Sequence, residues 1–241
     1  VLYQLYHLFN GKNLIKFTLK HLTPEWKLIR NMIDIAWPAT IQFLIGSGSW
    51  IVLASLVVHT GHSDASAGYQ IAIRIVIFFI LPAWGMSNAA ATLVGQNLGA
   101  NQPERAEQSV LRTAKYNAIF MGIVSLILIV FAEWIISFFT KDPIVKGYAI
   151  DAVRIVSAGY LFYGIGMVMI NAFNGAGDTR TPTVINLFGF WFFQIPLAWF
   201  LSTTLKLGPI GVFIAIPVAE TAITITSYIL FKKGKWKLQK V

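Results

Sequence analysis

Residues 113–136 read TAKYNAIFMGIVSLILIVFAEWII and carry no charged side chain between Lys115 and Glu133. A helix needs about 20 mostly apolar residues to cross the hydrocarbon core of a bilayer, and this stretch supplies them. It predicts a transmembrane helix, in which every backbone hydrogen bond is satisfied within the segment because lipid offers no partners.

The same pattern recurs along the chain. We predict six spans, at about 37–58, 68–95, 113–136, 148–172, 183–203 and 209–231. The expected fold is therefore all-α: a polytopic membrane protein whose transmembrane bundle covers 37–231. Residues 1–36 are expected to hold the end of a preceding span and a basic cytoplasmic connector, and 232–241 a basic cytoplasmic tail.

The composition is typical of a protein that lies in a lipid bilayer. Hydrophobic residues make up 56% of the chain, charged residues only 12%, and the net charge is +9, whereas soluble domains carry about 25% charged residues. The basic residues lie between apolar runs, so we interpret the positive charge as an orientation signal and expect no nucleic-acid partner. The absence of cysteine excludes disulfides and thiolate chemistry.

Lysine and arginine gather on alternate loops. One side holds Lys12, Lys16, Lys20, Lys27, Arg30, Arg105, Arg112, Lys115, Arg180, Lys232, Lys233, Lys235, Lys237 and Lys240. The other side holds Lys141, Lys146 and Lys206. Because positively charged loops stay on the cytoplasmic side, we expect six crossings with both termini in the cytoplasm.

Two glycine-rich loops carry recognisable motifs. Residues 94–106 read VGQNLGANQPERA and residues 171–182 read NAFNGAGDTRTP. Their glycines permit unusual backbone angles, and Asp178 with Thr179 can cap the helix that follows. Both segments are therefore expected to form tight turns between spans.

Together these motifs resemble the multidrug and toxic compound extrusion (MATE) family. Residues 95–100 resemble its loop between the second and third spans of each half, and residues 174–182 resemble its loop between spans ten and eleven. The resemblance extends to 35–40 (span seven), 189–197 (span eleven) and 208–220 (span twelve), so that it covers about 25–241 in family order and spacing.

The resemblance implies the C-terminal half of a twelve-span exporter in a bacterial inner membrane. Such a protein expels drug-like, cationic organic compounds in exchange for H⁺ or Na⁺, and needs neither enzyme activity nor a cofactor beyond the coupling ion. The chain also starts abruptly in an apolar stretch without Met. We therefore expect it to be a fragment whose partner is the N-terminal half.

Glu220 is the main candidate for coupling. It is the acid that we place near the middle of the last span, three residues after Pro217. An ionisable residue at that depth is expensive and therefore suggests function, here the binding and release of a proton. The alternative is a structural carboxyl, neutral or paired with Arg74 or Arg154.

Other polar side chains inside the spans are weaker candidates. They are Gln42, Asn88, Arg154, Tyr163, Asn171 and Gln194. Hydrogen bonds between helices explain any one of the uncharged members, whereas as a set they would line a cavity. Arg154 follows Asp151 by three residues, so we expect these two to form a structural ion pair. Arg74 is predicted either to snorkel to the interface or to pair inside the bundle.

The sequence disfavours metal ions. Some members of the family carry a cation site of carboxylates on the first and fourth spans of this half, but here the first span has none past Asp34 and the fourth has only Asp151 near its edge. We therefore prefer H⁺ over Na⁺ as the coupling ion, possibly through the N-terminal half. His59, His62 and Asp64 lie in the first outer loop without a fourth ligand, and we predict a solvated loop there.

Three other functions are considered. A flippase for lipid-linked saccharides of related fold needs a basic cavity for pyrophosphate, for which Arg74 and Arg154 are the two candidates. An intramembrane enzyme needs a nucleophile and base or a metal cluster, and no histidine lies in the predicted spans. A purely structural subunit does not account for the family motifs.

Overall fold

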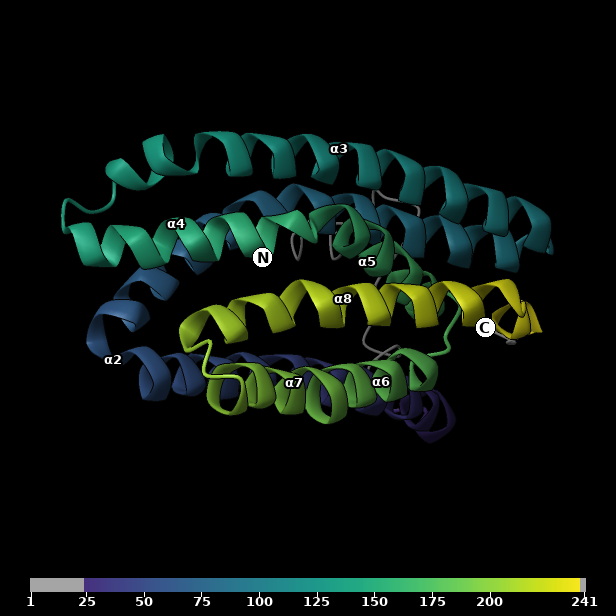
Figure 1. The fold of residues 1–241 in the computed structure, drawn as a ribbon. Helices are drawn as coiled ribbons and strands as arrows, with labels where there is room; N and C mark the ends of the chain where they lie inside the picture. The colour runs from purple at the N-terminus through teal and green to yellow at the C-terminus, as the bar shows by residue number, and fades with distance from the viewer. Residues whose placement is uncertain (1–23, 239–241) are drawn as a thin grey trace, which may run out of the picture. The chain divides into compact units, whose positions relative to one another are not determined.

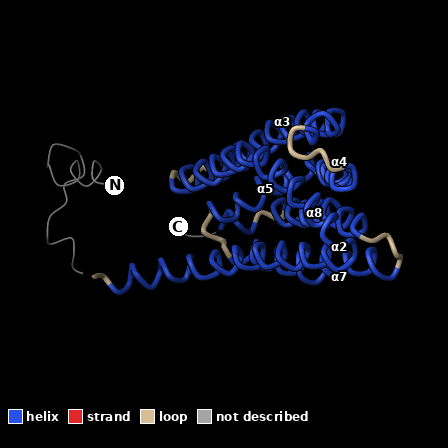
Figure 2. The backbone as a smooth tube through the Cα atoms, turned by 90° about the vertical axis from the view of Figure 1, so that its left-hand side faces the viewer, coloured by secondary structure: helices blue, strands red, loops and turns tan. Residues whose placement is uncertain are grey.

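The computed structural model of the chain describes residues 24–238. The predicted end of a preceding span at 1–9, the connector residues Lys12, Lys16 and Lys20, and Lys240 lie outside this range. Every regular element of residues 24–238 is helical (Figures 1 and 2), which confirms the all-α class. The chain divides into two units, Val1–Trp37 and Pro38–Val241. In the first, residues 26–37 are helical; the second holds the helices of the bundle.

Helix α2, Trp26–Gly99, is interrupted at one residue. His62 has φ 58° and ψ −157°, and the ribbon of α2 turns back on itself in Figure 1. We call residues 38–61 the first arm of α2 and residues 63–99 the second arm. The predicted outer loop around His59, His62 and Asp64 is thus wrong: the residues on both sides of His62 are helical, because a single residue of positive φ is enough to end one helix and begin the next.

The predicted span at 148–172 is built from two helices. Helix α3 (Pro103–Ser137) precedes α4 (Pro143–Ala158) and α5 (Tyr160–Gly175), and the axes of α4 and α5 differ by 54° across Gly159. Helix α4 begins where Asp142 accepts hydrogen bonds from the backbone N–H groups of Ile144 and Val145, at 2.9 and 3.1 Å. This N-cap and Pro143 at the first helical position explain why the helix starts five residues before the predicted boundary.

Residues 180–204 form one helical rod with locally wider turns. Its parts are α6 (Arg180–Asn186), η2 (Leu187–Gln194), α7 (Ile195–Trp199) and η3 (Phe200–Thr204). Both η segments are π-helical and flank Pro196, which lacks an N–H group and therefore cannot continue the regular hydrogen-bond ladder. Pro196 is thus accommodated by widened turns on both sides.

Helix α8 (Pro209–Lys232) completes the bundle, and a short 3₁₀ helix η4 (Lys235–Leu238) follows it. Within the described residues, four helices are long and apolar enough to cross a membrane, or five if α4 and α5 count as one bent span. The sixth predicted crossing requires each arm of α2 to cross separately, and it stays a prediction.

The two glycine-rich motifs pack against each other. A β-carbon on Gly175 would lie 2.3 Å from the carbonyl oxygen of Ala91, and one on Gly95 would lie 3.3 Å from that of Gly175. Gly95 and Gly99 are helical, and the turn after α2 is instead made by Asn101, with φ 56°. Gly95 of the first motif therefore serves close helix packing, whereas a β-carbon on Gly99 would meet no atom within 4 Å.

At the same end of the bundle, the predicted tail is partly docked. Glu107 of α3 accepts from Lys232 at 2.8 Å and pairs with Lys237 at 2.6 Å. Trp236 is fully buried and stacks on Phe231, with ring centroids 4.9 Å apart. Residues 232–238 are therefore held by charge and by aromatic packing against the ends of α3 and α8.

Candidate functional site

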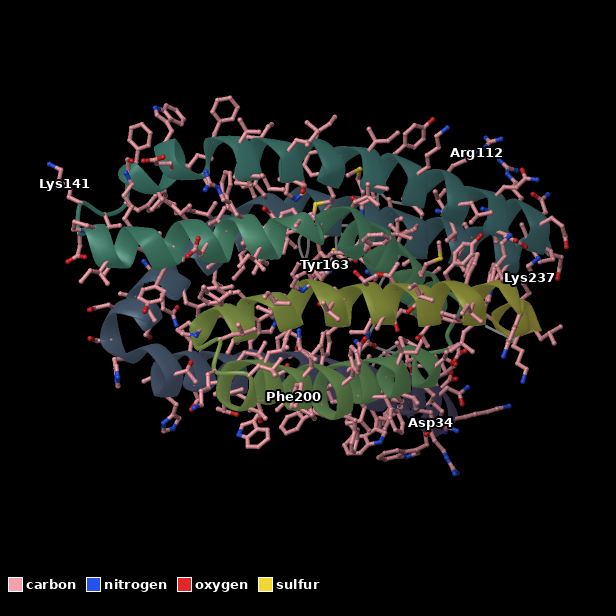
Figure 3. The ribbon with its side chains drawn as sticks, in the orientation of Figure 1. Asp34, Arg112, Lys141, Tyr163, Phe200 and Lys237 are labelled. Atoms are coloured by element: carbon pink, nitrogen blue, oxygen red, sulfur yellow. The ribbon has the colours of Figure 1, made fainter. Side chains whose placement is uncertain are left out.

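A small cavity lies where two helix irregularities meet, the break at Gly159 and the turn at Pro217. It is lined by Trp50, Val76, Ile80, Val156, Gly159, Tyr160, Tyr163, Ile216, Pro217 and Glu220. These residues come from both arms of α2, from the break between α4 and α5, and from the proline turn of α8. In Figure 3 Tyr163 lies between α5 and α8.

Glycine and tyrosine at the break fix the shape of this cavity. A β-carbon on Gly159 would lie 2.5 Å from the β-carbon of Pro217 and 2.9 Å from its Cα, so a larger residue cannot be placed there without moving a helix. Tyr160 donates from its hydroxyl to the carbonyl oxygen of Val76 at 3.0 Å, which ties the break to the second arm of α2. The volume open to the centre of a water molecule is about 20 Å³, and one water needs about 10–15 Å³ by this measure.

Glu220 is half-buried at this cavity, one turn after Pro217. The described residues provide its carboxylate with no hydrogen bond or ion pair. The two arginines proposed as its partners do not contact it. Arg154 donates from Nε to the carbonyl oxygen of Ile129 at 3.2 Å, and Arg74 makes no ion pair within the described residues. Gln194, another polar side chain of the spans, accepts from Ser49 at 2.8 Å. The reading in which these side chains hold Glu220 permanently is therefore wrong, and the carboxyl faces a water-sized space beside Tyr163.

The expected ion pair between Asp151 and Arg154 does not form among the described residues. The guanidinium of Arg154 reaches from α4 to the backbone of α3 instead of back along its own helix. The spacing of three residues permits the pair, but a carbonyl oxygen of the neighbouring helix is the partner that Arg154 takes.

The remaining predicted polar residues lie in separate places. Asn171 donates to the hydroxyl of Ser87, which itself donates to the carbonyl oxygen of Met167, so this group joins α5 to the second arm. Gln194 joins η2 to the first arm. The Oε1 atom of Gln42 is buried without a partner in the described structure, and Asn88 is exposed.

Of the seven predicted site residues, the structure thus brings Glu220 and Tyr163 to one cavity. The sequence analysis missed Trp50, Tyr160 and Gly159. The sequence analysis noted Pro217 only as the residue that precedes Glu220 by one turn, and the position of Gly159 opposite Pro217 could not be read from either segment alone. Among residues 24–238 there is no group of three or more His, Cys, Asp or Glu side chains placed to hold a metal ion.

A second hollow of about 390 Å³ lies between η2 and α8. Its lining residues are Val184, Ile185, Phe188, Gly189, Phe193, Ala222, Ile223 and Thr226. This hollow is larger than the cavity at Glu220 but carries no ionisable side chain. It can therefore accept apolar groups, and it offers no place to bind a proton.

Comparison with known proteins identifies relatives of this chain. Residues 38–200 match the MatE family. The chain is 27% identical over 219 residues to the probable multidrug resistance protein NorM of Thermotoga maritima, with 90% of this chain and 47% of that protein covered. It is 26% identical over 217 residues to the FAD transporter of Shewanella oneidensis, with 90% and 47% covered.

Among solved structures, a MOP superfamily transporter from Pyrococcus furiosus superposes with a TM-score of 0.91 at 22% identity. The alignment covers 100% of this chain and 54% of that chain. The chain thus spans about half the length of the relatives it matches, and at this identity the superposition establishes the fold alone.

Proposed function

Because this chain belongs to the MatE family, we propose that it forms part of a secondary active transporter that exports organic compounds in exchange for protons. The observation that carries the proposal is the family match over residues 38–200. One relative is named for multidrug resistance and another for the transport of FAD, and these names support organic compounds as the substrates. The cationic character of the substrate follows from the resemblance in the loop motifs.

Coupling to H⁺ is supported by the surroundings of Glu220. A Na⁺ ion needs several oxygen ligands, whereas a proton needs one carboxyl group, and the cavity contains one carboxyl and room for water. Protonation would remove the charge of Glu220 next to the contact between Gly159 and Pro217. A change of charge at a helix break gives alternating access a local trigger, because the two states of the carboxyl favour different packing.

The proposal also includes the membrane in which the chain lies and the N-terminal half with which it functions. The apolar helices make the chain an integral membrane protein, and the two relatives named above are bacterial. We place it in a bacterial inner membrane with both ends of the chain in the cytoplasm, on the basis of its lysine and arginine distribution. The N-terminal half of the transporter would complete the passage.

The test is Glu220→Gln in the complete transporter, reconstituted in vesicles with an imposed proton gradient. The glutamine keeps size and hydrogen bonding but cannot titrate, so we expect substrate binding and folding to persist while export against a gradient is lost. Glu133→Gln is the matched control, because Glu133 is 71% exposed at the far end of α3. Wild-type export with unchanged pH dependence in Glu220→Gln would show that the coupling carboxyl lies elsewhere.

A further inference from the structure

Helix α4 turns one narrow face to the outside of the bundle. Gly147, Asp151, Arg154 and Ala158 make up this face, and their spacings of 4, 3 and 4 residues keep them within about 60° around a helix of 3.6 residues per turn. Gly147, Arg154 and Ala158 are exposed and Asp151 is half-buried. The buried residues of α4 lie on the opposite side of the helix. An acid and a base therefore share the outward-facing surface of α4.

The surroundings of this face are apolar. Helix α4 lies between α3 and α8 (Figure 1), and the second arm of α2 covers its buried side, since a β-carbon on Gly68 would lie 2.9 Å from the backbone nitrogen of Ala149. The exposed side chains of the two flanking helices include Ile119, Ile123, Leu126, Ile127 and Val130 of α3 and Ile210, Val218 and Ile225 of α8. A surface of this kind faces lipid, so Asp151 and Arg154 are two charges on a lipid-facing side of the protein.

Neighbouring residues show the depth of these charges. Lys146 of α4 pairs with Glu133 of α3 at 3.6 Å, and the adjacent Trp134 is 65% exposed, as expected at a membrane interface. Arg154 donates from Nε to the carbonyl oxygen of Ile129, which lies four residues, or about 6 Å, from Glu133 along α3. A long side chain on a helix leans toward the N-terminus of that helix, and α4 begins at the predicted outer end, so Arg154 snorkels outward. Its guanidinium therefore reaches the headgroup region of the outer leaflet.

Neither charge is neutralised by the described residues. The bond from Nε of Arg154 to Ile129 turns the guanidinium away from its own helix, and the terminal nitrogens Nη1 and Nη2 have no acceptor among residues 24–238. The carboxylate of Asp151 takes part in no hydrogen bond or ion pair in the same range. Lys146, the nearest cation before it on α4, is engaged by Glu133. Uncompensated charges close to hydrocarbon are costly, so we expect a partner of complementary charge on this face.

The arrangement of the two charges matches one class of ligand. A planar guanidinium binds a phosphate group through two parallel hydrogen bonds, and a carboxylate accepts strong hydrogen bonds from an ammonium group. Asp151 lies three residues, or about 4.5 Å, from Arg154 toward the outer end of α4. A phosphate next to the membrane and an ammonium group two carbons further out form the headgroup of phosphatidylethanolamine. Gly147 leaves room for this headgroup, because a β-carbon there would meet no atom within 4 Å.

We propose that Asp151 and Arg154 bind the headgroup of a phosphatidylethanolamine molecule in the outer leaflet. Arg154 holds its phosphate and Asp151 its ammonium group, while the acyl chains lie along the apolar side chains of α3 and α8. The primary ammonium has three N–H donors, whereas the trimethylammonium of phosphatidylcholine has none and phosphatidylglycerol carries no positive charge. The site thus selects ethanolamine. It concerns the lipid partner of the protein and depends on neither the transported compound nor the coupling ion.

The first experiment measures lipid binding to the purified complete transporter by native mass spectrometry. The probes are dioleoyl phosphatidylethanolamine, its N-methyl and N,N-dimethyl forms, dioleoyl phosphatidylcholine and dioleoyl phosphatidylglycerol. We expect the affinity to fall along the methylation series as N–H donors are lost, with phosphatidylcholine binding about tenfold more weakly than phosphatidylethanolamine. Equal binding across the series would overturn the proposal.

Two substitutions separate the roles of the two charges. Asp151→Asn should weaken phosphatidylethanolamine about tenfold and leave phosphatidylcholine unchanged, and it should strengthen phosphatidylglycerol because Arg154 then stands alone. Arg154→Gln should weaken all three lipids, since each carries a phosphate. Lys141→Gln is the control, because Lys141 is exposed at the same predicted outer end (Figure 3), and it should keep the wild-type ratio of phosphatidylethanolamine to phosphatidylcholine. A uniform loss of all lipids in Asp151→Asn would show a structural effect and would overturn the role of the carboxylate.

The second experiment locates the bound lipid on the protein. The chain has no cysteine, so Gly147→Cys and Leu207→Cys can be introduced one at a time into the complete transporter, cleared of any other cysteine, in vesicles of dioleoyl phosphatidylethanolamine and phosphatidylglycerol. Leu207 is the matched control, because it is exposed at the predicted outer side and, like Gly147, follows a lysine. A short thiol-to-amine crosslinker joins the cysteine to the primary amine of a neighbouring lipid, and mass spectrometry detects the adduct of one lipid.

The yield of this adduct decides the position of the site. We expect about threefold or more adduct at Gly147→Cys than at Leu207→Cys, because a bound headgroup stays beside residue 147 while free lipids exchange. Adding Asp151→Asn to Gly147→Cys should remove the difference. Equal yields at the two positions, or a yield that Asp151→Asn does not lower, would place the lipid elsewhere and overturn the proposal.

Discussion

Gly159 and Pro217 lie in direct contact, so that a β-carbon on residue 159 would stand 2.5 Å from the β-carbon of Pro217. The first residue separates α4 from α5, and the second removes an N–H group from α8. Two helix breaks are therefore packed together, three residues along α8 from Glu220. Motion at either break must be accommodated by the other.

Gly159→Ala should destabilise the transporter. The added methyl group overlaps Pro217, and overpacking of this kind typically costs about 1–3 kcal/mol, so we expect thermal unfolding of the purified complete protein to begin several degrees lower. Gly147→Ala is the control, because a β-carbon there meets no atom within 4 Å and alanine favours the helix. Equal melting temperatures for the two variants would contradict the packing argument.

The docked end of the chain should loosen when Glu107 loses its charge. Glu107 lies before the predicted span 113–136, at the cytoplasmic end predicted for α3. The hydrogen bonds from Lys232 and Lys237 hold the pKa of its carboxyl below the ordinary value. The stabilisation is therefore fully present above the ordinary carboxyl pKa, about 4.3, and is lost as pH falls through the lowered value. Hydrogen exchange of residues 232–238, corrected for intrinsic rates, should stay slow at neutral pH and rise only in this acid range.

Substitution gives the same result at neutral pH. Glu107→Gln should speed tryptic cleavage after Lys232 and Lys233 by roughly three- to tenfold, as expected for the loss of charge-assisted hydrogen bonds. Glu104→Gln is the control, because Glu104 is 78% exposed and reaches Lys237 only at 4.0 Å. If the two variants are cut at the same rate, the lysines are held by aromatic packing and not by Glu107.

Reporter fusions test the predicted topology. Fusions at Ser63, Asn101, Lys141, Asp178 and Leu207 should lie alternately outside and inside, starting outside, because each arm of α2 is long enough to cross the bilayer and lysine and arginine gather on one side. An inside location for Ser63 would mean that the arms of α2 do not each cross, and would reduce the number of spans.

Export should require more than this chain. The chain spans about half the length of the relatives it matches, so vesicles that contain the chain as a monomer should not move the cationic dye rhodamine 123 against a gradient. Addition of the N-terminal half of the transporter should restore the movement. Uphill export by the isolated monomer would refute the need for a partner.

The sequence by itself determined that the chain is helical, that it lies in a membrane and which family it resembles. Apolar runs of about 20 residues have one stable form in lipid, and the motifs at 94–106 and 171–182 depend on local glycine and capping patterns. Glu220 could be singled out because an acid in an apolar run is costly wherever its helix packs. These features depend only on neighbours along the chain.

The tertiary structure decided which side chains meet. Arg154 and Asp151 share a helix, yet Arg154 bonds to Ile129 of another helix. Gly159 and Pro217 are separated by 58 residues, and their contact follows from the rotation and bend of two helices. Lipid fixes the length and the apolar surface of each helix but not its rotation about its own axis, which side-chain packing sets. For that reason the cavity at Glu220, and the exposed face of α4 that bears Asp151 and Arg154, become visible only when the helices are assembled.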